Sequence, residues 1–261
     1  MPSTREGDRL EIESFPDSLM PGPDLVQVWS GSQDQPARVI EDFLETLSDD
    51  ERKRAARFRF EKDRIHFIAA RGMLRRLLAH MLGVRPARVR FNYGKYDKPF
   101  LQEEFESSRL KFNISHSGGR ALLAFAVGRE VGIDIERIRP EVATEDIAER
   151  YFSACEVERL RSLPHDVQAE AFFNCWTRKE AFIKAIGEGL SCPLDKFDVT
   201  LAPGDAAMLL ATRVEAQPAS KWSMRALEAG DGYRAAIVVE GQQWDLAEQS
   251  WPGAPSSGHN I

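Results

Sequence analysis

The sequence predicts an α+β protein made of two similar halves. Helical stretches and several short strands occur before residue 128, and a related set follows it. The connections between successive strands are short, which favours antiparallel sheets packed on helices over a doubly wound parallel sheet. A chain of 261 residues, of which 43% are hydrophobic, is long enough to bury such a core.

The first half is predicted to cover residues 23–128, after a loose N-terminal segment at residues 1–22 that lacks periodicity. Ser48-Asp-Asp-Glu51 is a capping box that opens a helix. A longer helix is expected over 62–82, because apolar residues recur at helical spacing and Gly83 follows them. Strands are predicted over 24–30, 88–93, 110–114 and 121–127.

The second half is predicted to cover residues 129–240. Its strands are expected over 131–136, 196–201, 208–214, 222–227 and 233–239. Helices are expected over 144–152, 154–163 and 167–186, and Ser153-x-x-Glu156 is a second capping box. Residues 241–261 are rich in Gly, Gln, Ser and Pro, which predicts a disordered tail.

Composition excludes several classes of protein. No apolar run reaches the roughly 20 residues that a membrane-spanning helix needs, so no membrane partner is expected. The polar N-terminus lacks the apolar core of a secretory signal. Three cysteines (Cys155, Cys175 and Cys192) without metal-ligand spacing indicate a reduced, cytoplasmic protein.

The net charge of −6 is unevenly distributed along the chain. Residues 51–90 contain thirteen Lys or Arg and only three acids. Such a basic stretch is either a solvated helix face or the binding site of an anionic group. An acidic partner helix docking on this face would be tested by charge reversal at Arg75 or Arg76.

Two acids share one face of a predicted strand, Val131-Gly-Ile-Asp-Ile-Glu136. Because strands have a period of two, Asp134 and Glu136 point to one side while Ile133 and Ile135 point to the other. Two acids on one face repel each other. A divalent cation that prefers oxygen ligands is the commonest reason for such a pair.

A predicted helix supplies a third acid. Glu180 and Lys184 are four residues apart and share one helix face. They form either a surface ion pair or part of a site. The apolar neighbours, such as Trp176 and Phe182, favour a packed helix whose carboxylate needs a partner. A metal shared with Asp134 and Glu136 would provide one.

Asn113-Ile-Ser-His-Ser-Gly-Gly119 ends another predicted strand in a small polar turn. Such a turn can direct main-chain N–H groups and hydroxyls at a phosphate, and His116 could contact the same anion. A histidine in a loop is more often incidental, so His116 is considered only because of its neighbours in the sequence.

Three motifs together resemble the signatures of the 4′-phosphopantetheinyl transferases, of the large single-chain type that activates surfactin synthetase. They are Phe112-Asn-Ile-Ser-His-Ser117, Val131-Gly-Ile-Asp-Ile-Glu136 and Trp176-Thr-Arg-Lys-Glu-Ala-Phe-Ile-Lys184, followed by Gly187-Glu-Gly-Leu190. Their order and spacing agree over about residues 45–240, whereas one Asp-x-Glu alone would be weak evidence.

The resemblance implies two pseudo-symmetric α/β halves with the active site at their interface. The implied reaction moves the phosphopantetheine arm of coenzyme A to a serine of an apo carrier protein, with Mg²⁺, and releases 3′,5′-ADP. By the same resemblance Asp134, Glu136 and Glu180 are the metal ligands, and Glu180, Lys184 and His116 are catalytic.

The resemblance also implies a set of residues that bind coenzyme A. They are Arg54, Arg71, Lys95, Lys98, Ser115, His116, Lys179 and Lys184, with either Lys95 or Lys98 matching the lysine of a Gly-Lys-Pro element. Gly94-Lys-Tyr-Asp-Lys-Pro99 departs from that element, and Glu51 stands where the family has a basic residue. The implied state is a monomer.

Two other functions remain open from the sequence. A Mg²⁺-dependent nuclease also uses grouped acids and a basic patch, but the acidic pI of about 5.5 argues against a nucleic-acid partner. A catalytically silent coenzyme A-binding protein is the second alternative. The presence of Asp134, Glu136, Glu180 and Lys184 argues against it.

Overall fold

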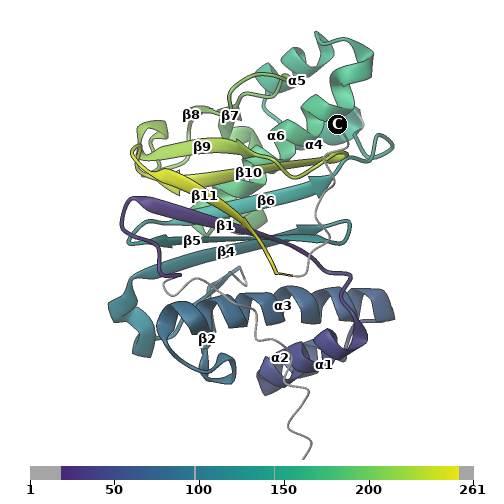
Figure 1. Ribbon diagram of the computed structural model, residues 1–261. Coiled ribbons are helices and arrows are strands. Elements are labelled where there is room, and N and C mark those ends of the chain that lie inside the picture. Colours follow the sequence, from purple (N-terminus) through teal and green to yellow (C-terminus); the bar gives the residue numbers. More distant parts are fainter. Residues whose placement is uncertain (1–18, 97, 144, 253–261) are drawn as a thin grey trace, which may run out of the picture.

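The computed structural model describes residues 19–96, 98–143 and 145–252, and it arranges them in four layers (Figure 1). A helical layer from the first half lies against one sheet, a second sheet stacks on the opposite face of the first, and helices of the second half cover the outside. The predicted α+β class with two related halves is confirmed. Within these ranges, none of the helices has the length and apolar character to cross a membrane.

The elements of the first half are β1 (Leu25–Ser32), α1 (Ala37–Thr46), α2 (Asp49–Ala55), α3 (Glu61–Leu82), β2 (Phe91–Tyr93), β3 (Pro99–Leu101), β4 (Leu110–Ser117) and β5 (Arg120–Val127). The sequence did not predict α1 or β3. The strand expected at 88–93 is shorter, because a 3-10 turn occupies Pro86–Arg88. Gly83 ends α3 in the left-handed conformation that glycine favours.

The elements of the second half are β6 (Val131–Arg137), α4 (Glu145–Tyr151), α5 (Ala154–Arg161), α6 (His165–Ile186), β7 (Phe197–Val199), β8 (Leu209–Thr212), β9 (Trp222–Leu227) and β10 (Tyr233–Glu240). All of them lie where the sequence predicted a helix or strand. Both predicted capping boxes are present, at Ser48–Glu51 and at Ser153–Glu156.

Two sheets meet face to face in the middle of the molecule. Their strand orders are β11-β1-β5-β4 and β6-β10-β9. The apolar layer between them includes Val28, Ala124, Ile133, Ile135 and Ile237, all 2% exposed or less. Because strand residues alternate between faces, the opposite faces of the same strands pack on α3 and on α6.

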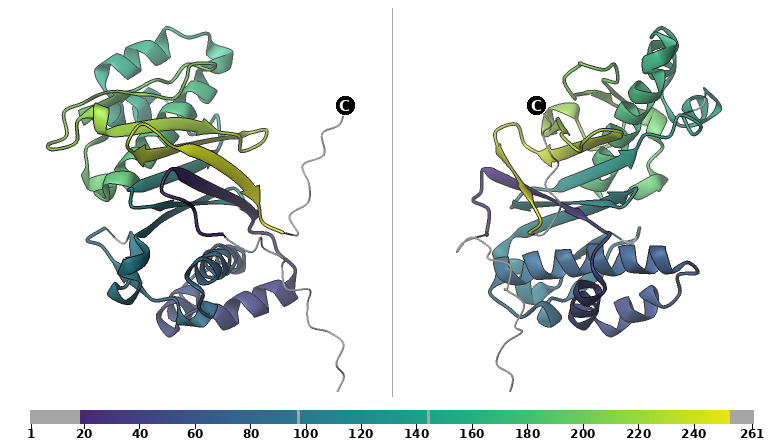
Figure 2. Two further views of the ribbon diagram at one scale, coloured as in Figure 1. Left: turned by 60° about the vertical axis from the view of Figure 1, so that its left-hand side comes forward. Right: turned by 45° about the vertical axis from the view of Figure 1, so that its right-hand side comes forward.

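The predicted disordered tail is wrong for the part of it that the structure describes. Asp245–Ser250 form β11, the yellow strand beside the purple β1 in Figure 2. The two strands pair in parallel, with Asp245 opposite Leu25. The buried tryptophans Trp244 and Trp251 flank this strand. Main-chain pairing and two large apolar side chains outweigh a polar composition, and they add a parallel edge to an otherwise antiparallel sheet.

The remaining terminal predictions fall mostly outside the described ranges. Residues 1–18 and 253–261 are not among the described residues, so the predictions for them are not tested. Leu19, in the predicted loose segment, is 1% exposed and belongs to the core of the first half.

The helix α6 can lie directly on β6 because residue 132 is glycine. A Cβ atom at Gly132 would overlap the carbonyl oxygen of Ala181 and the nitrogen of Ala185. This close approach sets the acids of β6 beneath the polar face of α6.

Candidate active site

A cavity of about 360 Å³ opens where β4 of the first half meets β6 and α6 of the second. Its lining consists of Ile114, Ser115 and His116 from β4, Asp134 and Glu136 from β6, and Trp176, Glu180 and Lys184 from α6. Asp134 and Glu136 point to the side opposite Ile133 and Ile135, as the strand period predicts. The structure therefore brings the three predicted acids to one cavity at the seam of the halves.

Asp134 is the centre of the polar contacts in this cavity. The ammonium of Lys184 donates to Asp134 Oδ1 at 2.6 Å, and Ser115 Oγ donates to the same oxygen at 2.7 Å. Lys184 Nζ also lies 3.0 Å from Ser115 Oγ. The other carboxylate oxygen, Asp134 Oδ2, is buried and has no hydrogen-bond partner among the described residues.

The acids perturb one another's titration. Burial, and next the charge of Asp134, raise the pKa of Glu180 to about 7, although Lys184 acts in the opposite direction. Burial also raises the pKa of Glu136, against a hydrogen bond from Ser117. The pKa of His116 is lowered, first by partial desolvation of its ring and then by the positive charge of Lys184. A carboxylate with a pKa near neutral can accept a proton at the pH of the cell.

The cavity suits a hard divalent cation by the chemistry of its donors. Oxygen ligands from carboxylates are those that Mg²⁺ prefers, and a buried Asp134 oxygen without a described partner calls for an ion or water. Among the described residues, however, no three acidic, imidazole or thiol groups already stand close enough to hold a metal ion. Lys184 contacts Asp134 Oδ1, so the second oxygen, Oδ2, is the one available to a cation.

A second polar cluster lies in the first half, around Glu51. Arg75 Nε donates to Glu51 Oε2 at 2.6 Å, and Arg71 Nε lies 3.3 Å from Glu51 Oε1. Two buried atoms here, Glu51 Oε1 and Arg71 Nη1, have no hydrogen-bond partner among the described residues. Burial lowers the pKa of Arg71, although Glu51 opposes the shift.

Arg54 and Arg71 flank one aromatic ring. The guanidinium of Arg54 lies 5.6 Å from the centre of the Phe67 ring, and that of Arg71 lies 5.8 Å from it. Arg54 is exposed, whereas Arg71 is buried. The expectation that Arg75 belongs to an exposed docking face is wrong, because its side chain is 1% exposed and bound to Glu51.

Lys98 contacts main-chain carbonyl groups in the structure. Its ammonium donates to the carbonyl of Lys184 at 2.7 Å and lies 3.4 Å from those of Ala185 and Val131. A cation at the carboxyl end of a helix satisfies carbonyl groups that have no helical partner. Lys95 is exposed and lies against the ring of Tyr96, outside the cavity.

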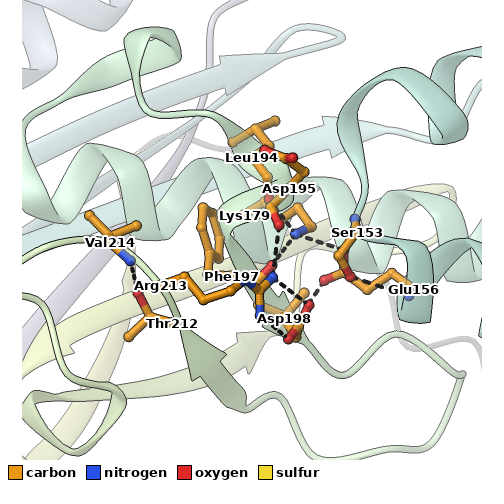
Figure 3. A network of polar contacts seen from close by, with 11 residues as sticks. Ser153, Glu156, Lys179, Leu194, Asp195, Phe197, Asp198, Thr212, Arg213 and Val214 are labelled. Atoms are coloured by element: carbon orange, nitrogen blue, oxygen red, sulfur yellow. Dashed lines mark hydrogen bonds and ion pairs between the residues drawn. The ribbon is translucent and has the colours of Figure 1, made fainter.

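The prediction that Lys179 contacts coenzyme A is wrong. Its side chain is fully buried, and its ammonium contacts Glu156 and the carbonyls of Leu194 and Phe197, each at 2.7 Å (Figure 3). Lys179 is next to Glu180 in the sequence, but successive helix residues point in directions about 100° apart. The lysine therefore faces the interior while Glu180 faces the cavity.

A further residue beside the acids, Ser117, was not predicted from the sequence. Ser117 Oγ donates to Glu136 Oε2 at 2.7 Å. The available signal was the strand period, because Ser117 follows Ser115 by two residues and shares its face.

Comparisons with known proteins match both halves. A model described as the 4′-phosphopantetheinyl transferase superfamily matches residues 130–238, and one for the N-terminal part of 4′-phosphopantetheinyl transferase matches residues 27–127. The 4′-phosphopantetheinyl transferase HetI of Nostoc sp. is 41% identical over 221 residues, which are 85% of this chain and 90% of HetI. The transferase Sfp of Bacillus subtilis is 34% identical over 161 residues, 62% of this chain and 69% of Sfp.

Solved structures match a smaller part of the chain. A holo-(acyl-carrier-protein) synthase from Bacillus anthracis, in complex with CoA (3′,5′-ADP), is 22% identical. The match covers 43% of this chain and 96% of that one, with a TM-score of 0.36.

Proposed function

This chain belongs to the 4′-phosphopantetheinyl transferase superfamily, and from that premise we propose that it moves the phosphopantetheine arm of coenzyme A onto a serine of an apo carrier protein, in a Mg²⁺-dependent reaction that releases 3′,5′-ADP. The observation that supports this most directly is the meeting of Asp134, Glu136, Glu180 and Lys184 in one cavity between the halves.

Coenzyme A carries a diphosphate and a separate 3′-phosphate, and the protein has cationic groups in two places. Arg71 offers a buried N–H donor without a described partner, next to the exposed Arg54, and this pair suits the 3′-phosphate. Lys184, which lines the cavity, suits the diphosphate, and the His116 ring beside it can offer a hydrogen bond. Ser115 takes part by holding Lys184 and Asp134.

In the proposed reaction the serine oxygen of the carrier attacks the phosphorus that bears the pantetheine arm. A new oxygen–phosphorus bond forms, the bond from that phosphorus to the bridging oxygen breaks, and 3′,5′-ADP leaves with the bridging oxygen. Glu180 accepts the proton of the serine, and Lys184 neutralises charge on the leaving group.

Asp134, Glu136 and Glu180 are the residues that would hold Mg²⁺. When bound, the ion supplies Lewis-acid neutralisation of the diphosphate oxygens. The buried Asp134 Oδ2 supports this assignment, because a cation would satisfy an oxygen that no described residue contacts. Lys184 is paired with Asp134 in the same cavity, which places its ammonium where a phosphate oxygen would need a cation.

The function is tested by incubating the protein with an apo carrier protein, coenzyme A and MgCl₂, and by recording the intact mass of the carrier. The expected result is a gain of one phosphopantetheine group. Glu180→Gln should lower the transfer rate by about 10²- to 10⁴-fold, the usual contribution of a positioned base. Glu158→Gln, an exposed glutamate of α5, is the matched control and should transfer normally.

Other results would refute the proposal. Binding of coenzyme A without any mass gain would identify a silent binding protein, and Mg²⁺-dependent degradation of DNA would identify a nuclease. Full transfer by Glu180→Gln would remove Glu180 from the mechanism.

A further inference from the structure

The strands β4 and β6 belong to different sheets, and each is an end strand of its own sheet. They nevertheless lie next to each other at the seam of the halves, where the cavity opens. An end strand has main-chain N–H groups that no neighbouring strand accepts. Those on the free side of β6 need acceptors, since this part of β6 is largely buried.

Side chains of β4 provide these acceptors. Asn113, Ser115 and Ser117 share one face of β4, because they are two residues apart. The N–H of Ile133 donates to Asn113 Oδ1 at 2.9 Å, and that of Ile135 donates to Ser115 Oγ at 3.4 Å.

The third contact completes the series. The N–H of Arg137 donates to Ser117 Oγ at 3.1 Å. Each donor lies 20 residues after its acceptor. We call these three contacts the side-chain ladder; it replaces main-chain pairing and sets a single register between the two sheets.

The same serines hold the acids of β6. Ser115 Oγ donates to Asp134 Oδ1 and Ser117 Oγ donates to Glu136 Oε2, both at 2.7 Å. A hydroxyl has one proton and can accept two hydrogen bonds. Because the oxygen of Ser117 accepts from a main-chain N–H, its proton is left for Glu136. The hydroxyl therefore ties the orientation of this carboxylate to the register of the strand that carries it.

From this geometry we propose that Ser117 is a positioning residue for Glu136, and that the side-chain ladder aligns β6 so that both of its acids face α6 across the cavity. The inference rests on the proposed function for its catalytic consequence, but the ladder itself can be tested without any reaction. Neither Ser117 nor Asn113 lines the cavity, so both act through other residues.

The test compares Ser117→Ala with Ser117→Thr, which keeps the hydroxyl. Ser223→Ala is the matched control, because Ser223 also lies on a strand and donates to a carbonyl, that of Gly241, at 2.6 Å. The first measurement is amide hydrogen exchange of the free protein by NMR. Ser117→Ala should speed exchange at Arg137 by about tenfold or more and leave the amides of β10 unchanged, whereas Ser117→Thr and Ser223→Ala should match the parent protein.

The second measurement separates positioning from binding. Outer partners of metal-binding side chains typically change metal affinity or activity by about 10- to 100-fold. In Ser117→Ala we expect kcat to fall within that range and the dissociation constant for Mn²⁺, measured by calorimetry, to rise in parallel. KM for coenzyme A should stay within about twofold, and Ser117→Thr should recover kcat.

Two results would overturn the proposal. The first is that Ser117→Ala shows the same amide exchange rate at Arg137 and the same Mn²⁺ affinity as Ser223→Ala. The other is a lowered kcat that Ser117→Thr does not restore. If the parent protein transfers no phosphopantetheine, the proposed function fails, but the exchange of Arg137 still decides whether the ladder exists.

Discussion

Both halves contain the same buried arrangement of a glutamate and a cation, and they use it differently. In each half a capping box places its glutamate, Glu51 or Glu156, against a long helix. The cation is Arg75 in α3 and Lys179 in α6, which occupy the same position in two helices of 22 residues. This correspondence supports a common plan for the two halves.

The difference lies in how completely the polar atoms are paired. In the second half Lys179 has three acceptors, and both oxygens of Glu156 accept hydrogen bonds, from Val199 and Ser153. In the first half Glu51 Oε1 and Arg71 Nη1 lack hydrogen-bond partners among the described residues, and Glu51 Oε1 has only the ion pair with Arg71 Nε at 3.3 Å. The polar atoms of one cluster are therefore all paired, whereas the other cluster has unused hydrogen-bonding capacity, as the proposed 3′-phosphate site would need.

The largest expected effect comes from breaking the complete cluster. Lys179→Met leaves Glu156 buried without its cation, which typically costs about 3–5 kcal/mol of unfolding free energy. Denaturant unfolding measures the loss. Lys196→Met, at an exposed lysine, is the matched control and should change stability by less than about 0.5 kcal/mol. A loss below about 1 kcal/mol in Lys179→Met would mean that this cluster contributes little to stability.

A smaller effect is expected from the incomplete cluster. Arg71→Leu removes the donor proposed for the 3′-phosphate, while Glu51 keeps its hydrogen bond from Arg75. Charged hydrogen bonds contribute about 1.5–3 kcal/mol, so KM for coenzyme A should rise about 10- to 100-fold, with kcat nearly unchanged. Steady-state kinetics measures both constants. Arg57→Leu, in the same basic stretch, should behave like the parent, and an equal rise there would leave Arg71 without a specific role.

The smallest expected effect is the loss of stability caused by ionised Glu180 in the cavity. The pKa of Glu180 is about 7 in the folded protein and 4.5 as its ordinary value. Protonation therefore favours the folded state, and this stabilisation is lost as the pH rises through 7. In the metal-free protein at pH 8, Glu180→Gln should be more stable than the parent by about 1–2 kcal/mol, and the gap should shrink toward pH 5.

Denaturant unfolding in EDTA at both pH values measures this gap. Glu158→Gln should show no such gap at either pH, because Glu158 is an exposed glutamate of α5. Equal free energies of unfolding for the parent and Glu180→Gln at pH 8 would show that ionised Glu180 does not destabilise the folded protein. Together, Lys179→Met and Glu180→Gln measure two opposite effects of α6 on the free energy of unfolding: the stabilisation by buried Lys179 and the destabilisation by ionised Glu180.

The sequence predicted those features that depend on local periodicity. The faces of Asp134 and Glu136 follow from the strand period, and both capping boxes follow from their spacing. The side chain of Lys179 was assigned wrongly because its direction depends on Glu156, more than twenty residues away. Lys98 likewise contacts carbonyls of a helix far along the chain.

The strand β11 was missed for a related reason. Its residues, Asp245–Ser250, alternate weakly and have little β propensity, so composition alone predicts a tail. Its pairing partner is β1, at the opposite end of the sequence, and no local pattern reports such a contact. The tryptophans on either side were the only local signal.

The position of β11 has a consequence for how the protein forms during synthesis. β11 follows β1 by more than 200 residues and completes its sheet, so the N-terminal half lacks one sheet edge until residues 245–250 have been made. Pairing across such a separation is slow, because the intervening loop must close first. Until β11 is available, the first strand has an unpaired edge, a state in which early contacts with other nascent chains compete with native closure.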